Sequence, residues 1–169
     1  MLIEKHNSVV GPNDNVLFLG DFSFKSPGIY AKLLNGKKHL ILGNHDRKGI
    51  NTYEDFDTVF KGLYNSFNEF TFIYSDEDEL LSAAQVEICG KTVGLCHYSA
   101  GWSDVYDEQN TKIRPRSDKI WRFFESCSVE HIIHGHLHSK LVPEGAVSCV
   151  QYHNACCEHL DFTPIRIGD

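Results

Sequence analysis

The sequence predicts a single α/β domain over residues 1–169, built as a layered α/β/β/α sandwich with mixed central sheets. Short continuous apolar runs such as VLFLG (16–20) alternate with helical patterns in the first half of the chain, and such runs are typical of strands buried on both faces. Strands that read as hairpins follow in the second half, so the sheets would be mixed. A chain of 169 residues is also long enough to bury a sizeable core.

The first half reads as alternating helices and strands. Residues 2–10 have helical spacing that stops at a Gly-Pro pair, and the run at 16–20 follows as a strand. Ser26 is expected to cap a helix over 28–34. HLILG (39–43) is a second buried strand, and a further helix is expected at 53–64.

The second half reads as strands around one helix. Three strands are expected at 70–74, 83–90 and 91–98. Gly90-Lys91 would form the hairpin turn between the last two. Ser117 is expected to cap a helix over 118–127. Short strands complete the pattern at 130–135 and, two or three of them, within 147–167.

The composition excludes several classes of protein. A net charge of −7 argues against binding of long duplex nucleic acid through a broad basic surface. A small anionic substrate stays open, because bound divalent cations can reverse the field inside a site. We find no signal peptide and no apolar run near the ~20 residues that cross a bilayer, so we expect a cytoplasmic protein without membrane association. The six cysteines lack a C-x-x-C pair and are expected to be small, buried free thiols.

Polar side chains follow four of the expected strands. They are Asp21 after LFLG, Asn44, His45 and Asp46 after LILG, His97 after VGLC, and His136 and His138 in IIHGHLH. Ligands of open α/β sheets bind at the carboxyl ends of the strands. A carboxylate, an amide oxygen and several imidazoles suit Mn²⁺, Fe²⁺, Zn²⁺ or Ni²⁺. In a locally extended chain His136 and His138 would point the same way, so each could serve a different ion.

Each cluster alone also has an ordinary structural explanation. Asn44 and Asp46 are good turn formers, and Asp21 follows a glycine. His97 by itself would more often be a hydrogen-bonded histidine of the core. The metal-site interpretation therefore depends on all four clusters ending strands in this order.

The motifs resemble those of the calcineurin-like metallophosphoesterase family. GD at 20–21, GNHD at 43–46, His97 and GHLH at 135–138 carry the resemblance, which extends along nearly the whole chain to small bacterial and phage members. It implies a metallophosphoesterase-like fold. It also implies a metal-dependent phosphoesterase that hydrolyses a phosphomonoester or phosphodiester by in-line attack of a metal-bound hydroxide.

The resemblance also implies roles for individual residues. Asp21 would bridge two divalent ions. Asn44, His97 and His136 would complete one metal site, whereas His138 would belong to the other. His45 would face the substrate phosphate and would stabilise or protonate the leaving group. Asp46 would orient the imidazole of His45.

One motif of the family is missing. The family pattern opens with Asp-x-His on a first strand, and no such motif precedes Asp21. We therefore expect a missing first strand, one complete metal site, and a second site left with Asp21 and His138. The strand edge exposed in this way could support self-association. The alternative function is a degenerate member that binds metal, phosphate or a partner protein with little or no turnover.

The tail contains a weaker metal-binding pattern. His153, Cys156, Cys157 and His159 form H-x-x-C-C-x-H, for which a structural zinc is conceivable. If this segment is an extended strand, however, the adjacent cysteines point to opposite faces.

Overall fold

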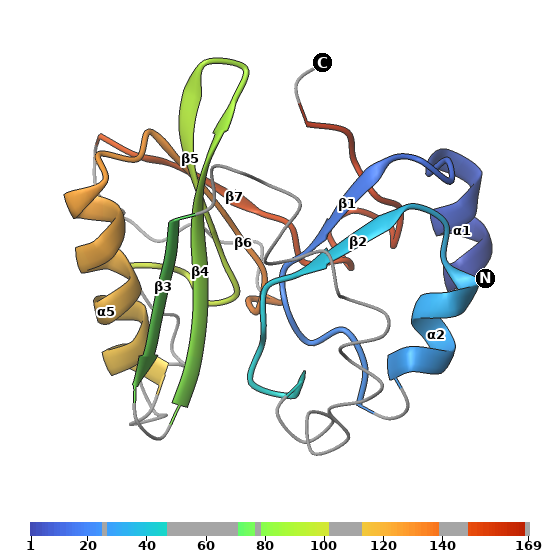
Figure 1. Ribbon diagram of the computed structural model, residues 1–169, viewed down its shortest axis with the longest axis horizontal. Helices are drawn as coiled ribbons and strands as arrows, with labels where there is room; N and C mark the ends of the chain where they lie inside the picture. Colours follow the sequence, from blue (N-terminus) through green and yellow to red (C-terminus); the bar gives the residue numbers. More distant parts are fainter. Residues whose placement is uncertain (25–26, 47–70, 77–78, 102–112, 139–148, 168–169) are drawn as a thin grey trace.

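The computed structural model describes residues 1–24, 27–46, 71–76, 79–101, 113–138 and 149–167 (Figure 1). Its helices are α1 (Leu2–Val9), α2 (Pro27–Leu33) and α5 (Ile113–Ser126). Its strands are β1 (Asn15–Phe18), β2 (Lys37–Leu40), β3 (Thr71–Asp76), β4 (Glu79–Ile88), β5 (Lys91–Cys96), β6 (His131–His134) and β7 (Gln151–Asn154).

The strands form two sheets that face each other. β1 and β2 pair in parallel. The second sheet has the order β3-β4-β5-β6-β7 and is mixed, because β3, β4 and β5 are antiparallel whereas β5, β6 and β7 are parallel. Figure 1 shows α5 outside the five-stranded sheet and α1 and α2 outside the two-stranded sheet. The predicted α/β/β/α sandwich is therefore confirmed, and the five-stranded sheet is mixed as expected, whereas the two-stranded sheet is parallel.

Apolar side chains fill the spaces between these layers. Ile41, which follows β2, packs in one cluster with Leu95 of β5, so the two sheets share a core. Phe124 of α5 is fully buried against the outer face of the five-stranded sheet. A Cβ atom on Gly94 of β5 would lie 2.8 Å from the Phe124 ring, so the helix packs directly on the strand backbone. This packing holds the two sheets in place, and the polar clusters follow the ends of strands in both sheets.

Several local expectations differ from the structure. α5 begins at Ile113, so Ser117 lies inside the helix and does not cap it; its hydroxyl donates to the carbonyl of Ser99. The β4–β5 turn is Cys89-Gly90, one residue earlier than expected, and both residues have positive φ, as a tight hairpin turn requires. In the described part of the tail only β7 is a strand. Ser26 and the expected helix 53–64 lie outside the described residues.

The expectation that the cysteines are buried is wrong for most of them. All six are free thiols, but only Cys96 is buried, whereas Cys89, Cys149 and Cys157 are exposed. Cys89, Cys149 and Cys157 lie in turns, where their side chains meet solvent.

Among the described residues, no helix is long and apolar enough to span a lipid bilayer.

Candidate metal centre

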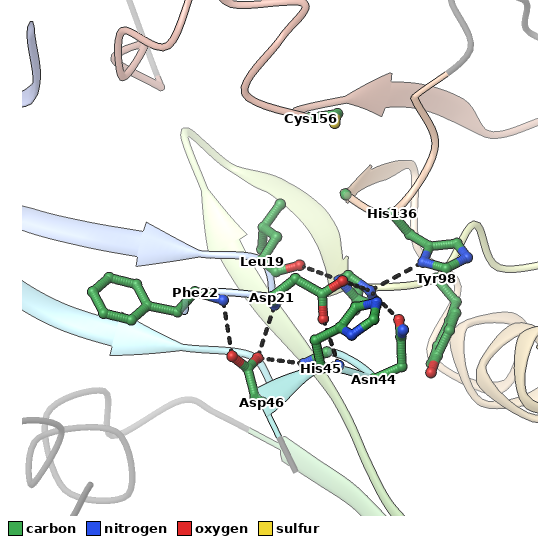
Figure 2. A network of polar contacts seen from close by, with 12 residues as sticks. Leu19, Asp21, Phe22, Asn44, His45, Asp46, Tyr98, His136 and Cys156 are labelled. Atoms are coloured by element: carbon green, nitrogen blue, oxygen red, sulfur yellow. Dashed lines mark hydrogen bonds and ion pairs between the residues drawn. The ribbon is translucent and has the colours of Figure 1, made fainter. Parts of the chain in front are cut away.

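The loops after four strands converge between the two sheets (Figure 2). Two of them approach so closely that only glycine fits. A Cβ atom on Gly20, which has φ 92°, would lie 2.3 Å from Nδ1 of His97, and a Cβ atom on Gly43 would lie 2.3 Å from Oδ1 of Asp21. Gly20 of the GD motif thus lets the loop after β1 reach the His97 imidazole, and Gly43 of the GNHD motif lets the loop after β2 pack directly on Asp21.

His97 lies at the middle of this cluster, and its side chain is almost fully buried. Its Nδ1 atom is 2.7 Å from the carbonyl oxygen of Leu19, which can only accept a hydrogen bond. In the neutral imidazole the proton is therefore on Nδ1, and Nε2 carries a lone pair. This Nε2 lies 3.0 Å from Oδ1 of Asn44 and 3.1 Å from Nδ1 of His136.

Asp21 supplies the carboxylate of the cluster. Its Oδ2 lies 3.5 Å from Nε2 of His97, and its Oδ1 accepts the backbone N–H of His45 at 2.8 Å. Burial on its own would raise the pKa of Asp21, but its contacts with the His97 imidazole and with the backbone N–H of His45 together lower this pKa below its ordinary value. The carboxyl is therefore ionised at neutral pH.

These donor atoms fit a divalent cation. One donor atom each from Asp21, His97 and His136 lies within 4.8 Å of the others, and Asn44 adds an amide oxygen beside His97. With the His97 proton on Nδ1, no proton separates Nε2 from the Asn44 oxygen, so two lone pairs face each other. A cation between them removes this repulsion. The mixed nitrogen and oxygen set suits Mn²⁺, Fe²⁺, Zn²⁺ or Ni²⁺.

Two residues of the cluster adopt backbone conformations that side chains rarely take. Asp21 has φ 54° and His136 has φ 65°. The Leu137 N–H donates to the Gly135 carbonyl at 2.7 Å, which makes His136 the centre of a three-residue turn. Such conformations store strain and concentrate at functional sites, where the surrounding structure holds them in place.

Asp46 has different partners from those expected. Its Oδ2 accepts the N–H groups of Asp21 and Gly43, and its Oδ1 accepts that of Phe22, each at 2.8 Å. Burial raises the pKa of this carboxyl, and the three amides oppose the shift. Asp46 is buried, and its carboxylate holds the two loops together. Its expected role in orienting the ring of His45 stays a prediction.

The side chain of His45 is exposed at the edge of the cluster. Its ring lies at an angle to the ring of Phe24, with 4.8 Å between their centroids. The imidazole is thus accessible from solvent next to Asp21, while its own backbone N–H holds the Asp21 carboxylate. The expected role of His45 toward substrate stays a prediction.

His138 does not join Asp21 in the described structure. The left-handed turn at His136 breaks the extended alternation that would have pointed both imidazoles the same way. His136 therefore faces His97, whereas His138 is mostly exposed and its Nδ1 lies 2.5 Å from Oε2 of Glu158. The expected second site with Asp21 and His138 as its ligands is not assembled here.

Sequence reasoning missed one residue that borders the centre. The ring of Tyr98 lies 5.0 Å from the rings of both His97 and His136 and meets each at a steep angle. Its hydroxyl accepts a hydrogen bond from Arg116 of α5 at 3.1 Å. Tyr98 follows a candidate ligand directly in the sequence, and that adjacency is the signal that could have identified it.

His6 packs inside the fold, away from the metal centre. It is buried on α1, its Nε2 lies 3.1 Å from the Asn35 carbonyl, and its ring stacks on Phe18.

The fold is similar to solved structures. A protein of unknown function from Aquifex aeolicus matches with a TM-score of 0.63 and 22% identity, over 97% of this chain and 78% of that one. An archaeal phosphodiesterase matches with a TM-score of 0.44 and 18% identity, over 85% of this chain and 67% of that one. A Vps29 variant from Entamoeba histolytica matches with a TM-score of 0.41 and 18% identity, over 90% of this chain and 61% of that one.

The Aquifex match shows a shared fold along most of both chains. No protein-family model matches the sequence, and neither does any curated protein at a significant level.

Proposed function

We propose that this protein is a metal-dependent phosphoesterase that hydrolyses a phosphomonoester or phosphodiester. The observation that carries the proposal is the convergence of Asp21, His97 and His136 within 4.8 Å, with the Asn44 amide oxygen beside them. Loops from both sheets contribute, as expected for a ligand site at the carboxyl ends of strands. The motif resemblance in the sequence supports the same chemistry.

The chain's own residues prepare the site for a cation and an anionic substrate. Asp21 is ionised and held in place by the His45 amide. The Leu19 carbonyl keeps the His97 proton on Nδ1, so Nε2 is available as a ligand. When bound, divalent ions in such a centre supply Lewis-acid polarisation of the phosphoryl group and of an attacking water.

His45 is the proposed catalytic residue outside the ligand set. Its exposed imidazole stands beside Asp21, where a phosphate held at the centre would meet it. It would donate a hydrogen bond or a proton to the leaving oxygen, where negative charge develops. Asp46 is a positioning residue, because it holds the amides of both loops without touching the substrate side.

A second candidate function is binding of metal or phosphate with little or no turnover. One observation favours it: among the described residues, the donor group that contains Asp21 has ligands for one ion, and His138 lies in another group. A single ion provides less charge stabilisation than a two-metal clamp.

Hydrolysis of chromogenic phosphate mono- and diesters with Mn²⁺ separates the two functions. We expect turnover by the unaltered protein and its loss in Asp21→Asn and His45→Ala, with His153→Ala, a change at an exposed histidine of β7, as control. Turnover that survives both site substitutions would overturn the proposed enzyme. Tight Mn²⁺ binding without any turnover would favour the binding function.

A further inference from the structure

A second group of metal-ligating side chains lies outside the centre described above. Nδ1 of His138, Sγ of Cys156 and Oε2 of Glu158 lie within 4.8 Å of one another. The Glu158 oxygen is 2.5 Å from the His138 nitrogen and 3.3 Å from the Cys156 sulfur, and the sulfur is 4.0 Å from the nitrogen. In Figure 2, Cys156 lies apart from the dashed network around Asp21.

The two segments that carry these side chains are tied together by their backbones. β6 and β7 pair in parallel and end side by side, and the Ala155 N–H then donates to the His134 carbonyl at 2.7 Å. Asn154 links both segments, because its amide donates to the Leu137 carbonyl at 2.8 Å and its Oδ1 accepts the Cys156 N–H at 3.0 Å. The Asn154 side chain thus holds both Leu137, which precedes His138, and the backbone of Cys156.

The observed separations lie on both sides of the spacing that a zinc-like ion requires. Tetrahedral zinc with bonds of 2.0–2.3 Å places its ligand atoms about 3.3–3.8 Å apart. The three separations here run from 2.5 to 4.0 Å, so small side-chain movements would reach that range. An exposed His–Glu ion pair alone contributes little stability and requires no half-buried sulfur beside it.

The group differs from the zinc pattern read in the sequence. Residues 157–162 form turns instead of a strand. His153 lies against His131, with 3.2 Å between their ring nitrogens, and His159 faces the Leu137 carbonyl through Nε2. Of the four residues in that pattern, Cys156 alone joins the group.

We propose that His138, Cys156 and Glu158 bind a thiophilic divalent ion such as Zn²⁺, at a site separate from the Asp21 centre. A thiolate ligand selects for such ions, whereas the Asp21 centre offers only nitrogen and oxygen. Three protein ligands leave the fourth position open for water or another ligand. The proposal does not depend on the phosphoesterase function.

Binding displaces one proton from the sulfur. In the metal-free protein the Cys156 thiol donates to the Glu158 carboxylate. Burial, together with this carboxylate, raises the pKa of the thiol to about 12. On binding, the S–H proton passes to solvent, and the sulfur and the carboxylate oxygen both turn their lone pairs to the ion.

Titration of the chelator-treated full chain with Co²⁺ tests this site. A thiolate bound to Co²⁺ gives a near-ultraviolet charge-transfer band, which Zn²⁺ should abolish by displacement. We expect the band in the unaltered protein, its loss in Cys156→Ser, and an apparent affinity at least tenfold weaker in His138→Ala and Glu158→Gln. Cys157→Ser is the matched control and should keep the band, because Cys157 is an exposed cysteine outside the group.

The variant Asp21→Asn separates this proposal from the phosphoesterase proposal. It should abolish turnover but leave the thiolate band unchanged. The proposal is overturned if the unaltered protein shows no band, if the band persists in Cys156→Ser, or if Asp21→Asn removes it. Thermal unfolding of each variant identifies any that fails to fold. If Cys156→Ser does so, the folded His138→Ala and Glu158→Gln variants decide, and unchanged affinity in both overturns the site.

Discussion

Nε2 of His97 lies 3.0 Å from the amide oxygen of Asn44, while Nδ1 of the same ring lies 2.7 Å from the carbonyl oxygen of Leu19. Both oxygens can only accept hydrogen bonds, and a neutral imidazole has one proton to donate. The single proton on Nδ1 serves the Leu19 carbonyl, and a cation between Nε2 and the Asn44 oxygen would satisfy both of these atoms. The carboxylate and second imidazole nearby make a shared metal ion the simpler arrangement.

The first prediction concerns this shared ion. Replacing His97 by Ala should weaken Mn²⁺ binding by at least about tenfold, since removing only an outer partner of a ligand already costs about 10–100-fold in affinity. Isothermal titration calorimetry measures the change. His131→Ala, a histidine outside the Asp21 group, is the control and should bind as the unaltered protein does. Equal Mn²⁺ affinity in His97→Ala would show that the ion does not occupy this site.

The second prediction separates two roles for Asp46. Its carboxylate accepts three backbone amides in a buried loop. Asp46→Asn turns an amide donor toward one or more of them, so we expect a loss of about 2–4 kcal/mol in the free energy of unfolding, measured by urea denaturation. Asp14→Asn is the matched control, because Asp14 accepts a single exposed amide, that of Gly11. Its expected cost is below about 1 kcal/mol.

If Asp46 instead served to orient the imidazole of His45, Asp46→Asn would affect turnover but not the free energy of unfolding. Asp46→Asn would then lower turnover while the urea midpoint stayed where it was. That result would contradict the positioning role assigned here to its backbone contacts.

Much of the fold was predictable from the pattern of apolar runs. VLFLG and HLILG each end in a glycine that a polar residue follows, and this combination places a strand end next to a loop. Helix α5 was foreseen but not its start, since Ser117 is a common capping residue and nothing local shows that its hydroxyl bonds to Ser99 instead. Tertiary contacts decide such boundaries.

The sequence predicted which residues form the site, but it did not predict how these residues contact one another. Asp21, Asn44, His97 and His136 were named from strand ends, and the structure brings them together. The separation of His136 from His138 depends on one left-handed residue, for which the sequence carries no glycine signal. The role of Glu158 depends on the parallel pairing of β6 and β7, a long-range contact that local patterns do not encode.

The third prediction tests the close approach of the loops after β1 and β2. In Gly43→Ala the new methyl group would meet Oδ1 of Asp21 at 2.3 Å and its backbone nitrogen at 2.5 Å. Because backbone cannot swing away as a side chain does, Asp21 must move, and we expect Mn²⁺ affinity to fall by at least about tenfold. Gly11→Ala meets only a flexible side chain at 3.3 Å and is the control. Unchanged Mn²⁺ binding in Gly43→Ala would contradict the role of the glycine.

The last prediction concerns the pH dependence of stability through His39. This side chain on β2 is buried, and its Nε2 lies 3.2 Å from Oδ1 of Asn15. Burial, aided by the charge of Lys37, lowers the pKa of His39 below its ordinary value. Between the lowered pKa and about 6.5 the unfolded chain binds more protons than the folded chain, so stability falls as the pH falls through this window.

We expect His39→Gln, which stays neutral and keeps an amide donor for Asn15, to lose less unfolding free energy than the unaltered protein when the pH is lowered from about 7.5 to about 5. Urea denaturation of the chelator-treated protein at both pH values gives the two differences. Other buried histidines such as His134 are common to both proteins, so they contribute equally and cancel when the two differences are compared. Equal acid sensitivity in the two proteins would mean that His39 is not protonated more readily in the unfolded chain. Greater sensitivity in His39→Gln would reverse the sign argued here.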